Sequence, residues 1–228
     1  MYHSVRFAVG STVKNSWDDW YLVPSSRPVI NPPKPKYVTV DIPGANGAID
    51  LSEVTSGEVV YENRTGSIEF IVFNEKPMEW FELYSQIMDY LHGKPVQISL
   101  EDEIPAGSTI PSYYYEGRCE VDGWQSGANY STISITYDLY PYKFATQATS
   151  ETINLSSTNV QKTYKNGRMA VIPKFTVSDT CTVTWKGNEY TLSKGENAVA
   201  NIVFEEGNNT ISFKGSGTVT ITFREGRL

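Results

Sequence analysis

The stretch that decides the fold is Val40-Asp41-Ile42-Pro43-Gly44-Ala45-Asn46-Gly47-Ala48-Ile49-Asp50-Leu51-Ser52. It places two turn signals, Pro43-Gly44 and Asn46-Gly47, between two β-prone segments. Proline fixes its own φ, and glycine takes a positive φ without steric cost. None of these residues is typical of a nucleophile, a metal ligand or a phosphate cradle. The stretch therefore predicts a turn-rich loop between strands, in which Asp41 and Asp50 make local hydrogen bonds.

The composition is that of a globular protein rich in β structure. The 228 residues suffice for one large all-β domain or two small ones. Hydrophobic residues make up 39% of the chain and aromatic residues 13%, and aromatic residues favour strands and interfaces. The net charge is −7, and no cluster of lysine and arginine occurs. A groove for nucleic-acid phosphates is therefore not expected, and the acidic charge is expected to keep the protein soluble.

The N-terminal part is predicted to be mainly β with one helix. Five prolines between Pro24 and Pro35 predict a loop or an edge segment, because proline cannot donate to a β-ladder. A helix is expected to begin near Pro77, with Asn74 or Glu75 beside its first turn, and to stop at Gly93. Strands are expected at residues 37–40, 58–61, 67–73, 96–100, 113–121 and 130–137. The stripe that should pack the helix on the sheet comprises Trp80, Phe81, Tyr84, Ile87, Met88 and Leu91.

A change of composition after Phe144 predicts a second domain. Residues 145–158 are rich in threonine, serine and alanine, so we divide the chain into domains 1–145 and 146–228. Further along, we expect hairpins in which strands 181–185 and 189–192 flank Lys186-Gly187-Asn188, and strands 197–204 and 210–213 flank 205–209. A last strand at 218–223 directs Val219, Ile221 and Phe223 inward. Such regular spacing predicts a small antiparallel sandwich.

The candidates for chemistry are few. The two histidines are His3, near the N-terminus, and His92, which we expect to end the helix and interact with its last carbonyls. Glu101, Asp102 and Glu103 are interpreted as a solvated run in a loop and not as the separated acid pair of a glycosidase.

The aromatic pair Trp185 and Tyr190 has two interpretations. The two rings face each other if Gly187-Asn188 forms a two-residue turn. They then either stabilise the hairpin, which we favour, or stack on a sugar.

Cys119 and Cys181 lie 62 positions apart and form no Cys-x-x-Cys motif. We expect two reduced, buried thiols in a cytosolic product. We expect neither a secretory signal nor a segment that spans a bilayer. No catalytic, cofactor-binding or metal-binding residue is assigned, and no cofactor is expected.

Several short motifs, taken in order, resemble the distal tail proteins (the Dit family) of long-tailed siphophages and prophages of Gram-positive bacteria. The resemblance covers nearly the whole chain and rests on the order and spacing of the motifs. In the N-terminal part they are Val40-Asp41-Ile42-Pro43-Gly44, Gly47, Asp50-Leu51-Ser52, Tyr61-Glu62-Asn63-Arg64, Leu91-His92-Gly93-Lys94, Tyr114-Tyr115-Glu116-Gly117-Arg118, Asp138 and Pro141-Tyr142-Lys143. In the C-terminal part they are Asn166-Gly167, Val171-Ile172-Pro173 and Phe223-Arg224-Glu225-Gly226-Arg227-Leu228.

The resemblance implies a virion structural protein and not an enzyme. The implied fold is mainly β, with an N-terminal β-sandwich or barrel-like ring domain that carries one α-helix, and a C-terminal galectin-like β-sandwich. The implied role is a hexameric ring hub that joins the tail tube to the tail tip or baseplate. The implied partners are other copies of the chain, the tail tube protein, a tail-associated tip or lysin protein, and receptor-binding or baseplate proteins. DNA would pass the lumen without specific binding, and the protein would assemble in the bacterial cytoplasm and reside in the phage tail.

A ring subunit needs two different surfaces that match when the ring closes. Edge strands and a Pro-rich arm, residues 25–35, are candidates for them. An acidic ring would also repel DNA in its lumen. Longer members of the resembled family insert carbohydrate-binding modules, for which this chain has no room. Two other functions remain open, an adhesion module that binds host-wall glycans through the C-terminal sandwich and, more weakly, a wall hydrolase.

Overall fold

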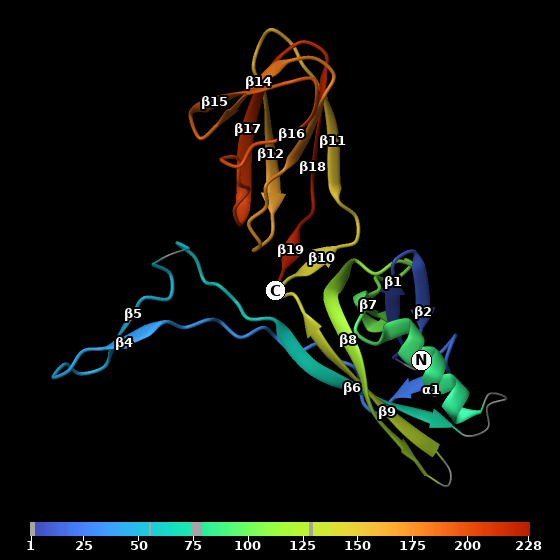
Figure 1. Cartoon of the computed structure of the whole chain (residues 1–228). Coiled ribbons are helices and arrows are strands. Elements are labelled where there is room, and N and C mark those ends of the chain that lie inside the picture. The colour runs from blue at the N-terminus through green and yellow to red at the C-terminus, as the bar shows by residue number, and fades with distance from the viewer. Residues whose placement is uncertain (1–2, 55, 74–78, 128–129) are drawn as a thin grey trace. The chain divides into compact units, whose positions relative to one another are not determined.

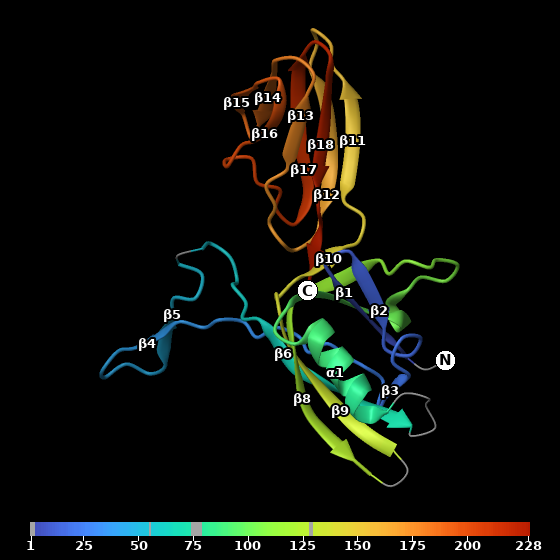
Figure 2. The same cartoon turned by 45° about the vertical axis from the view of Figure 1, so that its right-hand side comes forward.

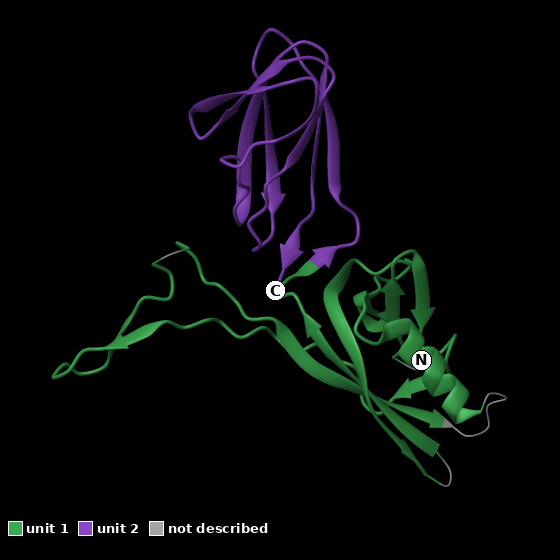
Figure 3. Ribbon diagram, in the orientation of Figure 1, with its two compact units in different colours: residues 1–143 green, residues 144–228 purple. Residues whose placement is uncertain are grey.

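The computed structural model describes residues 3–54, 56–73, 79–127 and 130–228. It divides the chain into two compact units, unit 1 (Met1–Lys143) and unit 2 (Phe144–Leu228) (Figure 3). The fold is mainly β, as predicted, with one α-helix in the part of the chain that the structure describes. Within that part, no helix is long and apolar enough to cross a membrane.

Unit 1 is built on seven described strands that pair side by side in one antiparallel sheet (Figure 1). Across the sheet they are β2 (Thr12–Asn15), β1 (Val5–Val9), β7 (Pro95–Leu100), β8 (Tyr113–Ser126), β9 (Tyr130–Leu139), β6 (Arg64–Phe73) and β3 (Leu22–Pro24). The long strands β6, β8 and β9 pair side by side, and a bulge between Val121 and Trp124 shifts the register of β8 on β9. Such a bulge increases the local twist of the strands.

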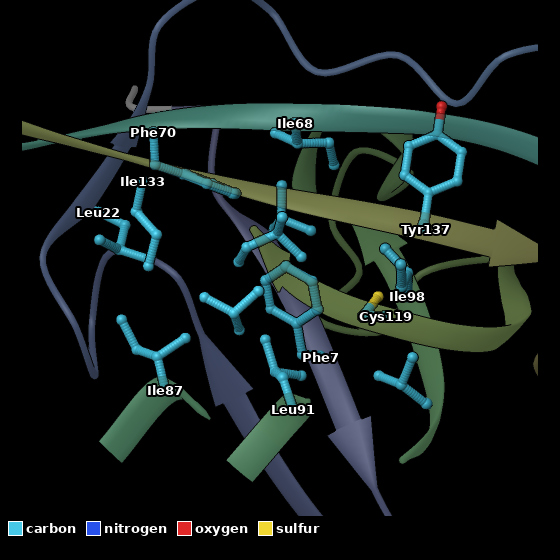
Figure 4. Packing of buried hydrophobic residues seen from close by; sticks show 14 of the residues in the cluster. Phe7, Leu22, Ile68, Phe70, Ile87, Leu91, Ile98, Cys119, Ile133 and Tyr137 are labelled. Atoms are coloured by element: carbon cyan, nitrogen blue, oxygen red, sulfur yellow. The ribbon is translucent and has the colours of Figure 1, made fainter. Parts of the chain in front are cut away.

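The core of unit 1 follows from the two-residue period of its strands. Ile133, Ile135 and Tyr137 alternate with polar residues along β9 and are all buried. On β6, Ile68 pairs with Ile135, and Phe70 pairs with Ile133. Figure 4 shows these side chains on the same side of the sheet as Phe7 and Cys119, in one cluster. Burial of such apolar side chains stabilises the fold by about 1.5–3 kcal/mol each.

Helix α1 (Trp80–Leu91) covers this core with a narrower face than the sequence predicts. Leu83, Ile87 and Leu91 are its buried residues, and they recur at spacings of four. Trp80 and Phe81 are 48% and 56% exposed, so their prediction as core-facing residues is wrong. They lie outside the face formed by the buried leucines and isoleucine. The predicted start near Pro77, with Asn74 and Glu75, lies outside the described residues.

Helix α1 ends before His92, as expected, but the contact with a helix carbonyl comes from the His92 backbone and not from its ring. The backbone N–H of His92 donates to the Met88 carbonyl at 3.0 Å, and Gly93 follows with φ +70°. A positive φ at this position is the usual helix stop and favours glycine. The His92 ring joins the helix end to β8, because its Nδ1 accepts a hydrogen bond from the Val121 N–H at 3.2 Å.

The remaining elements of unit 1 are short. They are β4 (Thr39–Asp41), β5 (Ala48–Asp50) and the 3-10 helix η1 (Glu101–Glu103). The strand expected at 58–61 is not formed, and only an isolated bridge joins Tyr61 to Pro35.

Unit 2 is a sandwich of two four-stranded antiparallel sheets. One sheet has the order β11 (Thr149–Asn154), β18 (Thr218–Phe223), β13 (Lys174–Val177) and β16 (Gly195–Ala198). The other has the order β12 (Val160–Asn166), β17 (Gly207–Gly215), β14 (Cys181–Trp185) and β15 (Asn188–Leu192). Strand β10 (Lys143–Ala145) pairs with β19 (Gly226–Arg227). The sheets share one core, in which the rings of Phe175 and Phe213 lie edge to face with centroids 6.0 Å apart.

Two of the hairpin predictions for unit 2 need correction. The turn between β14 and β15 is Lys186-Gly187, both at positive φ, so Val183 pairs with Tyr190 and Trp185 pairs with Asn188. This shift by one residue separates Trp185 from Tyr190. Residues 197–204 do not form a strand that pairs with β17, because β17 pairs with β12 and β14. The predicted inward side chains of β18 are buried.

We predict that neither cysteine reacts with Ellman's reagent at pH 8 in the folded chain. Burial raises the pKa of the Cys119 thiol to about 12 and also raises the pKa of Cys181, so both stay protonated, and the thiolate is the reactive form. Both cysteines are free and buried. Denaturation in guanidinium should release two titratable thiols. Rapid labelling of either thiol in the native chain would contradict this placement.

Candidate functional site

The strongest candidate for a functional site is an extended arm, residues 32–62, which leaves the sheet of unit 1 between β3 and β6 (Figures 1 and 2). Its two legs run antiparallel. Near the sheet, the Lys36 N–H donates to the Val60 carbonyl and the Glu62 N–H donates to the Lys34 carbonyl, both at 2.8 Å. Farther out, β4 and β5 pair, with Val40 opposite Ile49. The opening stretch of the sequence therefore forms the outer end of a two-stranded ribbon.

The tip of the arm has the turn that its sequence predicts. The Ala45 N–H donates to the Ile42 carbonyl at 3.1 Å across Pro43-Gly44, and Gly44 has φ +82°. Proline followed by a positive-φ glycine is the pattern of a type II turn. Ser52 donates from its backbone N–H to Asp50 Oδ1 at 2.9 Å. Hydrogen bonds from Ser52 lower the pKa of Asp50, as expected for a local Asx turn.

The arm exposes a series of apolar side chains. No described residue between positions 32 and 63 is buried. Tyr37 is 73% exposed and Val54 74%. The large exposed hydrophobic residues of the arm are Tyr37, Val38, Val40, Ile42, Ile49, Leu51, Val54 and Val60. A two-stranded ribbon is marginally stable alone, and apolar surface of this extent marks an interaction site.

A buried arginine fixes the root of the arm. Arg64 is 4% exposed and directly follows the second leg. Its Nη1 donates to the carbonyl of Asn31 at 2.9 Å, and its Nε donates to the carbonyl of Pro141 at 2.8 Å. Its guanidinium also lies 5.4 Å from the centroid of the Tyr115 ring. Burial lowers the pKa of Arg64. The three contacts offset part of the lost hydration, since Nη2 is buried with no hydrogen-bond partner among the described residues.

The tyrosines around Arg64 extend this network. The Tyr115 hydroxyl lies 3.3 Å from Glu103 Oε1, and burial raises the pKa of Tyr115 to about 12, which keeps it a neutral donor. The Tyr137 hydroxyl accepts a hydrogen bond from the Asn31 N–H at 3.0 Å. A Cβ at Gly66 would overlap this hydroxyl and lie 2.6 Å from Asn31 Nδ2. Glycine at position 66 therefore lets the Tyr137 hydroxyl and the Asn31 side chain lie close to the backbone of β6.

Residues from different sequence motifs, far apart along the chain, lie together at the root of the arm. Asn63 Nδ2 donates to Asp138 Oδ1 at 2.7 Å, and a Cβ at Gly117 would overlap the backbone carbonyl of Asp138. Two open hollows, of about 360 and 660 Å³, are both lined in part by Asn63 and Asp138. The sequence marked Asn63, Arg64, Gly117 and Asp138 as motif residues without giving them a role. It gave no signal for Asn31, Gly66 or Tyr137.

The other candidate residues have structural roles. Glu101, Asp102 and Glu103 form η1 and are not a freely solvated run. Arg6 Nε lies 2.5 Å from Glu101. Asp102 interacts with His3 Nδ1 and Arg27 Nε, both at 2.8 Å. Burial opposes ionisation of Asp102, but the bonds from His3 and Arg27 outweigh it and lower its pKa.

Two further kinds of candidate site are a sugar-stacking surface at Trp185 and a cluster of metal ligands. Trp185 is 4% exposed, so its ring offers no open face for a sugar. Within residues 3–54, 56–73, 79–127 and 130–228, no group of three or more histidine, cysteine or acidic residues could hold a metal ion.

The comparison with solved structures finds chains of similar fold. No family model and no curated protein matches the chain. Among solved structures, it is similar to the crystal structure of the SPP1 Dit protein, described as a paradigm of the hub adsorption apparatus in phages that infect Gram-positive bacteria. The TM-score is 0.63 at 15% identity, over 98% of this chain and 99% of that one. At this identity the likeness establishes a shared fold along both units.

We predict that Arg64→Ala destabilises unit 1 by about 2–4 kcal/mol, because it removes a buried side chain and leaves the carbonyls of Asn31 and Pro141 without their donor. Arg64→Lys should lose part of this stability, since an ammonium lacks the planar fork. Chemical denaturation followed by tryptophan fluorescence tests this, because four of the five tryptophans, all except Trp185, belong to unit 1. The matched control is Arg27→Ala, whose side chain is 69% exposed and should matter by less than about 1 kcal/mol. Equal stability of Arg64→Ala and the control would contradict the assigned role.

Proposed function

We propose that the chain is a structural subunit of a phage tail, and that copies of it form a hexameric ring hub between the tail tube and the tail tip or baseplate. In this proposal unit 1 builds the ring, and unit 2 is a galectin-like sandwich. The protein has no catalytic role and resides in the virion. Its partners are further copies of the chain, the tail tube protein, a tip or lysin protein, and receptor-binding or baseplate proteins.

The observation that carries the proposal is the arm itself. Eight large apolar side chains are exposed on a ribbon that Arg64 ties to the sheet. A surface held in place in this way, with no buried residue of its own, suits contact with another chain. A ring needs such a heterologous contact, in which one surface of a subunit meets a different surface of the next. The fold shared with a hub adsorption protein over 98% of the chain supports the same role.

The arm differs from the segment that the sequence suggested for this contact. Residues 25–35 were the expected Pro-rich arm, whereas the arm in the structure spans residues 32–62 and includes only the last prolines. The rest of that segment contains the exposed Val29 and the buried Ile30. The proposal therefore assigns the ring contact to the longer ribbon.

A second proposed function, glycan binding by unit 2, has less support. It relied on Trp185 and Tyr190 as a stacking pair, but Trp185 is buried and pairs with Asn188. Titration of the full chain with wall polysaccharide tests this alternative. The proposed structural role expects no saturable binding to unit 2.

We predict that the full chain assembles into rings with rising concentration, and that a variant without the outer arm stays monomeric. The variant replaces residues 37–59 with Asn-Gly, so that Lys36 and Val60, which already pair, are joined by a tight turn. Light scattering and negative-stain images report the state of assembly, and circular dichroism reports the fold. The control is Ile110→Ser, which removes an exposed apolar side chain of unit 1 outside the arm. A wild-type chain that stays monomeric, alone and with tail partners, would refute the proposal.

A further inference from the structure

The start of helix α1 carries two exposed aromatic side chains, Trp80 and Phe81, that lie outside the buried core of unit 1. We define the aromatic patch as these two residues together with Trp124, which is partly buried and packs against the core. The rings of Trp80 and Trp124 are stacked with centroids 5.5 Å apart, and the Phe81 ring lies edge to face on Trp80 at 6.2 Å. Trp80 and Phe81 are about half exposed, whereas the core face of the helix consists of Leu83, Ile87 and Leu91. Exposed aromatic side chains held together in this way are typical of an interface.

Two acidic side chains border the aromatic patch. Glu79 and Glu82 flank Trp80 and Phe81 in the sequence, and both are exposed. Neither glutamate takes part in an ion pair among the described residues, and the last turn of α1 carries no basic side chain. An occupant of the aromatic patch should therefore be apolar or proline-rich and carry basic groups next to its apolar side chains.

The first leg of the arm has this chemistry. We define the proximal leg as residues 32–38, Pro32-Pro33-Lys34-Pro35-Lys36-Tyr37-Val38. Three prolines restrict it to an extended conformation, which aromatic surfaces commonly bind. Lys34 and Lys36 are exposed and have no ion pair within the described part of the chain. Tyr37 and Val38 add exposed apolar surface.

The proximal leg and the aromatic patch occupy separate places on one chain. In Figures 1 and 2 the arm and α1 lie apart on unit 1. A ring contact is heterologous and so requires two different surfaces at separate places on the same unit. We propose that the proximal leg of one copy docks on the aromatic patch of the next copy, with Lys34 and Lys36 facing Glu79 and Glu82. This inference rests on the proposed ring function and names the receiving surface.

A pair of introduced cysteines tests the contact directly. Lys36→Cys with Glu82→Cys in the full chain should give disulfide-linked oligomers under mild oxidation. The control pair is Lys36→Cys with Asp89→Cys, which is exposed on the same helix, seven residues or about 10 Å farther along. The native cysteines are buried and should not contribute. We expect at least fivefold more cross-linked product from the first pair than from the control.

A charge exchange provides a second, independent readout. Lys34→Glu with Lys36→Glu should weaken assembly about tenfold or more, because it places like charges together. The addition of Glu79→Lys and Glu82→Lys should restore assembly, which a general loss of stability would not do. All variants are compared at equal ionic strength, because salt screens exposed pairs.

The outcomes separate this inference from the ring proposal. Preferential cross-linking together with rescue by charge exchange supports the inference. Rings that form without either effect would overturn the proposed docking, because the arm would then dock elsewhere or on another protein. The ring function would still stand in that case. A chain that is monomeric at every concentration would overturn both.

Discussion

The buried guanidinium of Arg64 is the interaction on which the course of the arm depends. It lies where the second leg joins β6, and it donates to the carbonyl of Asn31, the residue before the first leg. One planar group thus holds both ends of the arm, with Pro141 as a third point. Because the arm buries none of its described side chains, its direction relative to the sheet is set at this root.

The described parts of the structure differ in whether their apolar side chains are buried. Unit 2 buries its apolar residues between two sheets, and the sheet of unit 1 buries its own against α1. The arm and the aromatic patch leave large apolar side chains in water. Filled cores beside exposed apolar side chains of this size are typical of a protein with an interaction surface.

Local patterns in the sequence predicted the parts of the fold that depend on local physics. Alternation placed the strands around Ile133 and Val219 correctly, and glycine at Gly44 and Gly93 placed a turn and a helix end. The errors arose where small shifts or distant contacts decide the outcome. The turn at Lys186-Gly187 moved the pairing by one residue, and the helix turned Trp80 away from its core face. The Arg64 network, with the bond between Asn31 and Tyr137, joins residues up to 106 positions apart, which periodicity alone cannot reveal.

Hydrogen exchange along the arm, measured in monomer and in assembly, shows whether the arm joins the copies. Peptides from residues 36–62 should exchange fast in the dilute chain and at least tenfold more slowly after assembly, because docking removes their amides from water. Peptides from the core of unit 2 should exchange alike in both states. Equal, fast exchange of the arm in monomer and ring would contradict the account, because the arm would then not be the surface that joins the copies.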